Sequence, residues 1–131
     1  MEYVKSVLLV DDNPSCNFIM SEFIKLTDEQ IKVTMAESVD DALQLLATGA
    51  IPFPEVIYVD INMPVLDGFD FLEQFERRFL ITHPDTRVFM LSSSLRAEDR
   101  HRALMYRSVY DFVSKNDIDN FLQSSLTRAV A

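Results

Sequence analysis

Short apolar runs alternate along this chain with longer segments in which apolar residues recur every three or four positions. The short runs have the length and composition of buried β-strands, and the longer segments have the spacing of helices that bury one face. Five strands are predicted in this way, at residues 7–10, 31–36, 56–59, 88–91 and 110–114. A helical segment follows each strand, so one strand and one helix are repeated five times.

Polar residues and glycine mark several of the helix ends. Asn13 and Pro14 are typical of an N-cap followed by the first helical position, and Ser38 is a further N-cap candidate. Asp67 and Gly68 open another helix. Gly49 suits a helix C-terminus. The apolar stripe that predicts the first helix, which should run to about residue 26, consists of Cys16, Ile19, Met20 and Phe23.

Alternating strands and helices with right-handed crossovers predict an α/β fold, a doubly wound parallel sheet with helices on both faces. Five strands favour the order 2-1-3-4-5 of flavodoxin-like folds. The 131 residues, 48% of them apolar, suit a single domain spanning residues 1–131. We therefore expect no effector domain, so that any signal would leave through the surface of this domain.

Composition excludes several classes of function. The net charge of −9 argues against nucleic-acid binding, which requires clustered lysine and arginine. No apolar run reaches 18 residues and no signal peptide is recognisable, so we expect no membrane span and a cytoplasmic protein. Gly49 and Gly68 are the only glycines, which rules out both glycine-rich phosphate-binding motifs. The single cysteine, Cys16, is expected to be buried and inert.

Chemistry-bearing side chains stand at the carboxyl ends of four predicted strands. Asp11 and Asp12 follow the first strand, and Asp60 follows the third. Ser92 and Lys115 follow the fourth and fifth. In open α/β sheets these strand ends meet at one edge, and ligands bind where the strand order reverses, here between strands 1 and 3.

Three carboxylates at close range repel one another, by about 4 kcal/mol for a pair 4 Å apart at an effective dielectric near 20. Such a cluster takes up a proton or binds a cation. Because no histidine or cysteine is expected among the ligands, the set suits Mg²⁺, which Mn²⁺ can replace, better than zinc. A metal, a carboxylate, an ammonium and a hydroxyl together suit phosphoryl transfer, with Asp60 as nucleophile, Asp11 and Asp12 on the metal, and Ser92 and Lys115 on phosphoryl oxygens.

Each of these residues also has a structural interpretation. Asp11 and Asp12 could cap the following helix, and Asp60 could cap a turn. Ser92 lies in a serine-rich loop, and Lys115 could be a solvated lysine. The coincidence of the required side chains at four strand ends favours the chemical interpretation.

With these motifs in place, the chain resembles the receiver domain of response regulators in two-component signalling, over nearly its whole length. The segments that carry the resemblance are residues 7–14 (VLLVDDNP), 59–68 (VDINMPVLDG), 90–93 (MLSS) and 112–115 (FVSK). The resemblance implies that Asp60 is phosphorylated by a histidine kinase or phosphotransfer protein. It also implies that the backbone carbonyl of Asn62 completes the protein ligands of Mg²⁺ beside Asp11, Asp12 and Asp60.

The resemblance further assigns Ser92 and Phe112 to a switch. On phosphorylation the hydroxyl of Ser92 moves in, the ring of Phe112 turns inward, and the surface of helix 4, strand 5 and helix 5 changes for a downstream protein. The protein would be a monomer or a weak dimer.

One departure from the family concerns Asn116, which stands where the family usually has proline after the lysine. Because a cis bond without proline costs about 2.5–4 kcal/mol, we expect a trans Lys115–Asn116 bond with a displaced loop.

Two other functions compete with a phosphoryl-accepting switch that acts only on itself. A phosphohydrolase with an aspartate nucleophile, similar to haloacid dehalogenases, needs a general acid two residues after the nucleophile, where this chain has Asn62. A pseudo-receiver that binds partners without being phosphorylated is disfavoured by the complete set of Asp11, Asp12, Asp60, Ser92 and Lys115. Uptake of a phosphoryl group from acetyl phosphate distinguishes the three.

Overall fold

A computed structural model describes residues 2–128 of the chain. Its sheet has five parallel strands in the order β2-β1-β3-β4-β5, which confirms the predicted α/β fold and strand order. The strands are β1 (Ser6–Val10), β2 (Lys32–Ala36), β3 (Val56–Asp60), β4 (Arg87–Ser92) and β5 (Val109–Ser114). The three central strands are almost entirely buried, whereas the edge strands β2 and β5 are only partly covered.

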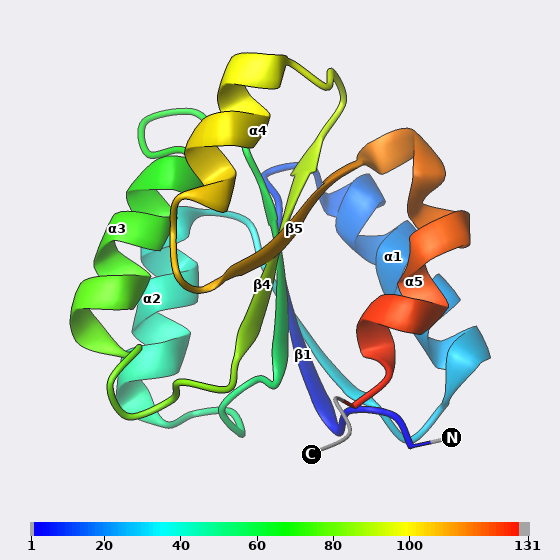
Figure 1. Cartoon of the computed structure of the whole chain (residues 1–131). Helices are drawn as coiled ribbons and strands as arrows, with labels where there is room; N and C mark the ends of the chain where they lie inside the picture. The colour runs from blue at the N-terminus through cyan, green and yellow to red at the C-terminus, as the bar shows by residue number, and fades with distance from the viewer. Residues whose placement is uncertain (1, 129–131) are drawn as a thin grey trace.

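Helices cover both faces of the sheet, as Figure 1 shows. They are α1 (Pro14–Thr27), α2 (Val39–Thr48), α3 (Gly68–Arg78), α4 (Ala97–Leu104), α5 (Ile118–Leu126) and a 3₁₀ turn, η1 (Lys115–Asp117). Helices α1 and α5 lie on one face, and α2, α3 and α4 lie on the other. Two buried apolar clusters, one on each face, join these helices to the sheet. Among the described residues, no helix is long and apolar enough to cross a bilayer.

The residues predicted at helix ends are confirmed as capping residues. The Asn13 side chain accepts hydrogen bonds from the N–H groups of residues 15 and 16, and the Ser38 hydroxyl accepts one from Asp41. Asp67 forms a capping box with Asp70, because each side chain accepts the backbone N–H of the other. Gly49 ends α2 at φ +70°, in the left-handed region that favours glycine.

The orientation of α1 differs from the one its apolar stripe indicates. Ile19 is 53% exposed and Phe23 38%, and Cys16 is half-buried rather than buried as expected. Of the predicted stripe only Met20 is fully buried, and the buried face also includes Ile24 and the polar Asn17. The Asn17 amide donates to the carbonyl of Asp11 at 3.0 Å and to that of Ala36 at 3.2 Å, so α1 is rotated to bond the ends of β1 and β2.

Two further details lie outside the sequence prediction. Helix α4 is short and ends at Leu104. The 3₁₀ turn η1 inserts between β5 and α5 and holds Lys115, the residue expected at the site.

Candidate functional site

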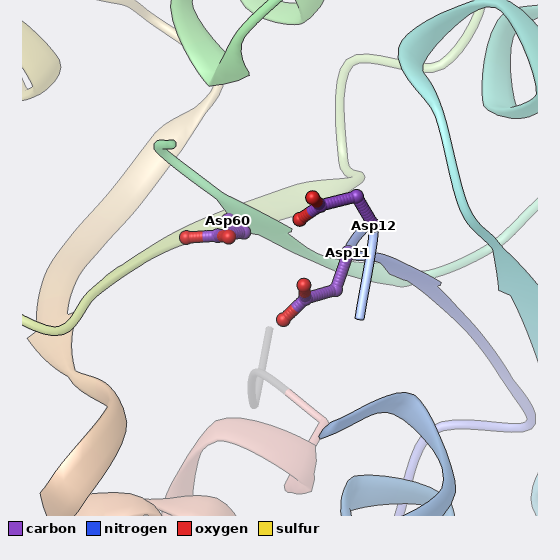
Figure 2. A group of neighbouring side chains, drawn as sticks. All are labelled: Asp11, Asp12 and Asp60. Carbon is purple, nitrogen blue, oxygen red and sulfur yellow. The ribbon is translucent and has the colours of Figure 1, made fainter. Parts of the chain in front are cut away.

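Three carboxylates converge beyond the carboxyl ends of β1 and β3, as Figure 2 shows. Asp11, Asp12 and Asp60 each offer an oxygen that lies within 4.8 Å of the others. Asp11 is 5% exposed and Asp60 is 6%, whereas Asp12 is open to solvent. Two of the three charges are therefore held largely away from water.

Backbone bonds fix these carboxylates at the strand ends. The N–H of Asp11 donates to the carbonyl of Ala36 at 3.1 Å, and Asp11 Oδ1 accepts the N–H of Asn13 at 2.9 Å. Asp60 Oδ1 accepts the N–H of Asn62 at 3.3 Å. The side chain of Asn62 is exposed, so this residue meets the site through its backbone.

Lys115 reaches across from η1 to the two buried carboxylates. Its Nζ lies 2.7 Å from Asp11 Oδ2 and 3.4 Å from Asp60 Oδ2, and its side chain is 20% exposed. Burial lowers the pKa of Lys115, but the hydrogen bond to Asp11 and the charge on Asp60 outweigh burial, so the pKa lies above its ordinary value. The ammonium is therefore charged at neutral pH.

For Asp60, burial is the largest influence on the pKa. Burial raises its pKa above the ordinary range, the charge of Lys115 lowers it, and the charge of Asp11 raises it again. The net effect is a raised pKa, so the ionised form of Asp60 destabilises the folded domain. A cation at this place would relieve the cost.

The donor set fits a hard divalent cation. All three side chains offer oxygen, the cluster includes no histidine or cysteine, and Asp12 is open to water. These are the features that Mg²⁺ sites share, because the ion retains waters beside one or two carboxylates. Asp11, Asp12 and Asp60 could hold such an ion at the edge of the sheet.

Ser92 lies at the end of β4 and is fully buried. Its hydroxyl donates to the carbonyl of Ser94 and accepts the N–H of Ser94 at 3.1 Å. The bonds close a tight turn at the start of the β4–α4 loop. To approach a group on Asp60, the hydroxyl has to give up its bond to this carbonyl.

Phe112 lies in β5 with its ring buried at 1% exposure, in the apolar cluster on the α2, α3 and α4 face. Its carbonyl accepts a hydrogen bond from Arg100 of α4 at 3.0 Å. The predicted switch turns this ring inward on phosphorylation, whereas in this structure the ring already points inward.

Helix α3 begins directly against the acceptor. A Cβ on Gly68 would lie 2.8 Å from the backbone oxygen of Asp60 and 2.9 Å from Cα of Ile61. The Gly68 N–H donates to the Ile61 carbonyl at 3.1 Å, which closes the loop from β3. Glycine at this position thus allows the close packing of α3 on the strand end.

A pocket of about 540 Å³ opens beside the site, between α1 and the start of α5. Asp11 and Lys115 line it together with apolar side chains of α1, including Ile19 and Phe23. The apolar stripe of α1 assigned these two residues to the core, so sequence reasoning missed them as site neighbours. An apolar stripe beside a strand end that carries aspartates is the signal that could have found them.

The link between Lys115 and Asn116 is trans, as predicted, because the described residues contain no cis peptide bond. Ser114 caps this turn: its hydroxyl accepts the N–H of Asn116 at 3.1 Å. Ser114 stands in the segment FVSK at residues 112–115, but its place in the sequence indicates no role for it.

Curated relatives match only in part of their length. Protein-glutamate methylesterase/protein-glutamine glutaminase 6 of Anaeromyxobacter dehalogenans is 33% identical over 109 residues, which are 83% of this chain and 29% of that protein. Protein-glutamate methylesterase/protein-glutamine glutaminase 2 of Pseudomonas aeruginosa is 34% identical over 112 residues, which are 84% of this chain and 30% of that protein. This chain spans under a third of these relatives, and the match covers their receiver domain without the catalytic domain.

Solved structures share the fold over nearly the whole chain. The two component response regulator from Cytophaga hutchinsonii is 29% identical with a TM-score of 0.80, covering 95% of this chain and 98% of that one. Chemotaxis protein CheY4 from Vibrio cholerae, at 24% identity and a TM-score of 0.75 over 93% and 98% of the two chains, supports the fold alone. A model of the response regulator receiver domain matches residues 7–126. The chain therefore belongs to the response regulator receiver domain family of two-component signalling.

Proposed function

We propose that this receiver domain takes up a phosphoryl group on Asp60 in a Mg²⁺-dependent reaction and passes the signal on through protein contacts. The donor is a histidine kinase or phosphotransfer protein, the class of partner with which receiver domains interact. The observation that carries the proposal is the convergence of Asp11, Asp12 and Asp60, with Lys115 between two of them.

The proposed step is a displacement at phosphorus. An Asp60 carboxylate oxygen attacks the phosphorus of a phosphohistidine, the P–N bond breaks, and its electron pair stays on the imidazole nitrogen, which later takes a proton. Lys115, already 3.4 Å from Asp60, donates to the phosphoryl oxygens and neutralises their charge. Loss of the group to water releases inorganic phosphate and restores Asp60.

Asp11 and Asp12, with Asp60 and the backbone carbonyl of Asn62, are the proposed protein ligands of the ion. Bound there, Mg²⁺ would supply positive charge against the phosphoryl oxygens, and Mn²⁺ could take its place. The carboxylates would position the ion, and its charge would favour the ionised form of Asp60.

We assign the readout to Ser92 and Phe112. The Ser92 hydroxyl would exchange the Ser94 carbonyl for a phosphoryl oxygen, which pulls on the β4–α4 loop. The Phe112 ring is buried in this structure and its carbonyl accepts a hydrogen bond from Arg100 of α4, so a movement of that loop and α4 would reach β5.

Two surfaces suit protein partners. Exposed Ile19 and Phe23 line the pocket that Asp11 and Lys115 also line, so we propose that an apolar patch on the donor covers them. Around α4 and β5, Leu104, Met105 and Tyr110 are exposed. We propose this α4–β5–α5 surface as the contact for a downstream protein.

The proposed chemistry is confined to the domain itself. Asn62 holds the position where an aspartate-based phosphohydrolase needs a general acid, and an amide cannot serve as one. The site therefore suits acceptance of a phosphoryl group better than turnover of an external phosphate ester.

Acetyl phosphate with Mg²⁺ tests the proposal by intact-protein mass spectrometry. The expected result is a gain of one phosphoryl group in the wild type, none in Asp60→Asn, and none when EDTA removes the metal. No gain in the wild type supports a pseudo-receiver instead. Rapid multiple turnover of an external phosphate ester supports a phosphohydrolase.

A further inference from the structure

We propose that Ser114 is the positioning residue for Lys115, because its hydroxyl caps the turn that aims the ammonium at Asp11 and Asp60. Ser114 is the last residue of β5, where it pairs with Ser92 of β4. Its hydroxyl accepts the N–H of Asn116 at 3.1 Å, across the lysine. The kinetic consequence of this inference rests on the proposed function, whereas its geometric consequence does not.

The chain is anchored on both sides of Lys115. Before it, the ladder between β4 and β5 holds Ser114. After it, η1 continues directly into α5, whose Leu122 and Leu126 are buried in the apolar cluster on the α1 and α5 face. The short link at Lys115 and Asn116 is exposed or half-buried, so the Ser114 cap is the local bond that sets its direction.

The Ser114 cap constrains the turn in place of a proline, because this sequence has Asn116 after the lysine. Proline at position 116 would fix φ there without a hydrogen bond, but it disfavours the helical region for the preceding residue. Lys115 is the first residue of a 3₁₀ turn and hence lies in that region. Asn116 keeps its N–H, and the Ser114 hydroxyl uses that N–H to hold the turn.

Removing the hydroxyl should matter more for the site than for the fold. Asn116 is exposed, so water can replace the lost acceptor in Ser114→Ala and the unfolding midpoint should change little. The backbone at Lys115, however, would no longer be held by the cap, so the position of the ammonium would be less well defined. A shift of about 1 Å in a positioning group can cost on the order of 100-fold in rate, and we expect about a tenfold loss here.

Chemical labelling tests the geometry without any phosphorylation. Lys115 in the full chain should react slowly with a limiting amine-acetylating reagent, compared by peptide mass spectrometry with exposed Lys25 and Lys32 in the same molecules. Ser114→Ala should raise the relative labelling of Lys115 several-fold, and Ser114→Thr, which keeps the hydroxyl, should not. Unchanged labelling of Lys115 in Ser114→Ala would overturn the inference.

The rate of phosphoryl uptake from acetyl phosphate, with Mg²⁺, tests the consequence. Ser114→Ala should slow uptake about tenfold in the wild-type background and have little further effect beside Lys115→Ala, because Ser114 acts through the lysine. An equal loss in both backgrounds would show a general structural role and contradict the inference. If the wild type takes up no phosphoryl group, the proposed function fails, and the labelling result alone decides the role of Ser114.

Discussion

Replacing Asp60 by asparagine should stabilise the folded domain, although the substitution removes the proposed acceptor. Asp60 lies within 4.8 Å of an oxygen on both Asp11 and Asp12, so at an effective dielectric of 20 each pair repels by about 3.5 kcal/mol. The Nζ of Lys115 lies 3.4 Å from Asp60 Oδ2, and this pair contributes about 5 kcal/mol of attraction at the same dielectric. The balance is about 2 kcal/mol of repulsion, to which the burial of the Asp60 charge adds.

The asparagine side chain in Asp60→Asn would keep most of the neutral contacts. Its oxygen can accept the N–H of Asn62, and Lys115 retains its 2.7 Å contact with Asp11. Allowing for the solvent around Asp12, we expect Asp60→Asn to raise the free energy of unfolding by about 1–2 kcal/mol at pH 7 without metal. Urea unfolding followed by circular dichroism in EDTA measures this change. The control Glu29→Gln, which removes an exposed carboxylate, should stay within about 0.5 kcal/mol of the wild type.

The pH dependence follows from the raised pKa of Asp60. The folded protein binds this proton more tightly than the unfolded chain, so the cost of the ionised carboxylate is absent below the unfolded pKa of about 3.9. That cost grows as the pH rises from the unfolded towards the folded pKa, and it is fully present above the folded pKa. The advantage of Asp60→Asn should therefore shrink as the pH falls, and Mg²⁺ should stabilise the wild type more than the variant. A variant that is less stable than the wild type at pH 7 in EDTA would refute the reasoning.

Three further substitutions test the surroundings of the site. Gly68→Ala should destabilise the domain by about 1–3 kcal/mol in urea unfolding, because its Cβ meets the backbone of Asp60, which cannot move aside alone. Tyr58→Phe should cost about 1 kcal/mol in the same assay, since it deletes the buried hydroxyl that bonds Ser125, while Ser125 keeps its own bond to the backbone of α5. Asp12→Asn should weaken Mg²⁺ binding about tenfold or more by calorimetric titration, because the site loses a charged ligand; unchanged affinity would place the ion elsewhere.

The fold could be predicted because its signals are local and agree with one another. Each central strand is short and apolar, and Asn13, Ser38 and Asp67 cap helices through bonds to residues two or three positions away. The rotation of α1 could not be predicted in this way. It depends on Asn17, whose amide bonds the ends of two strands, and those partners come together only in three dimensions.

The placement of the candidate site was predictable for a related reason. Parallel strand ends meet at one edge, so Asp11, Asp12 and Asp60 had to be neighbours once the strand order was given. The state of Ser92 and Phe112 was not predictable, because side-chain orientation depends on neighbouring loops and helices. Ser92 bonds the loop that follows it, and the Phe112 ring fills a place in the core.

Mapping the phosphoryl group tests the central claim most directly. After incubation with acetyl phosphate and Mg²⁺, borohydride reduces an aspartyl phosphate to homoserine, and peptide mass spectrometry locates the reduced residue. We predict reduction at Asp60 alone, dependent on Mg²⁺. Reduction at Asp11 or Asp12 instead, or no reduced residue in a protein that remains folded, would contradict the assignment of Asp60 as the phosphoryl acceptor.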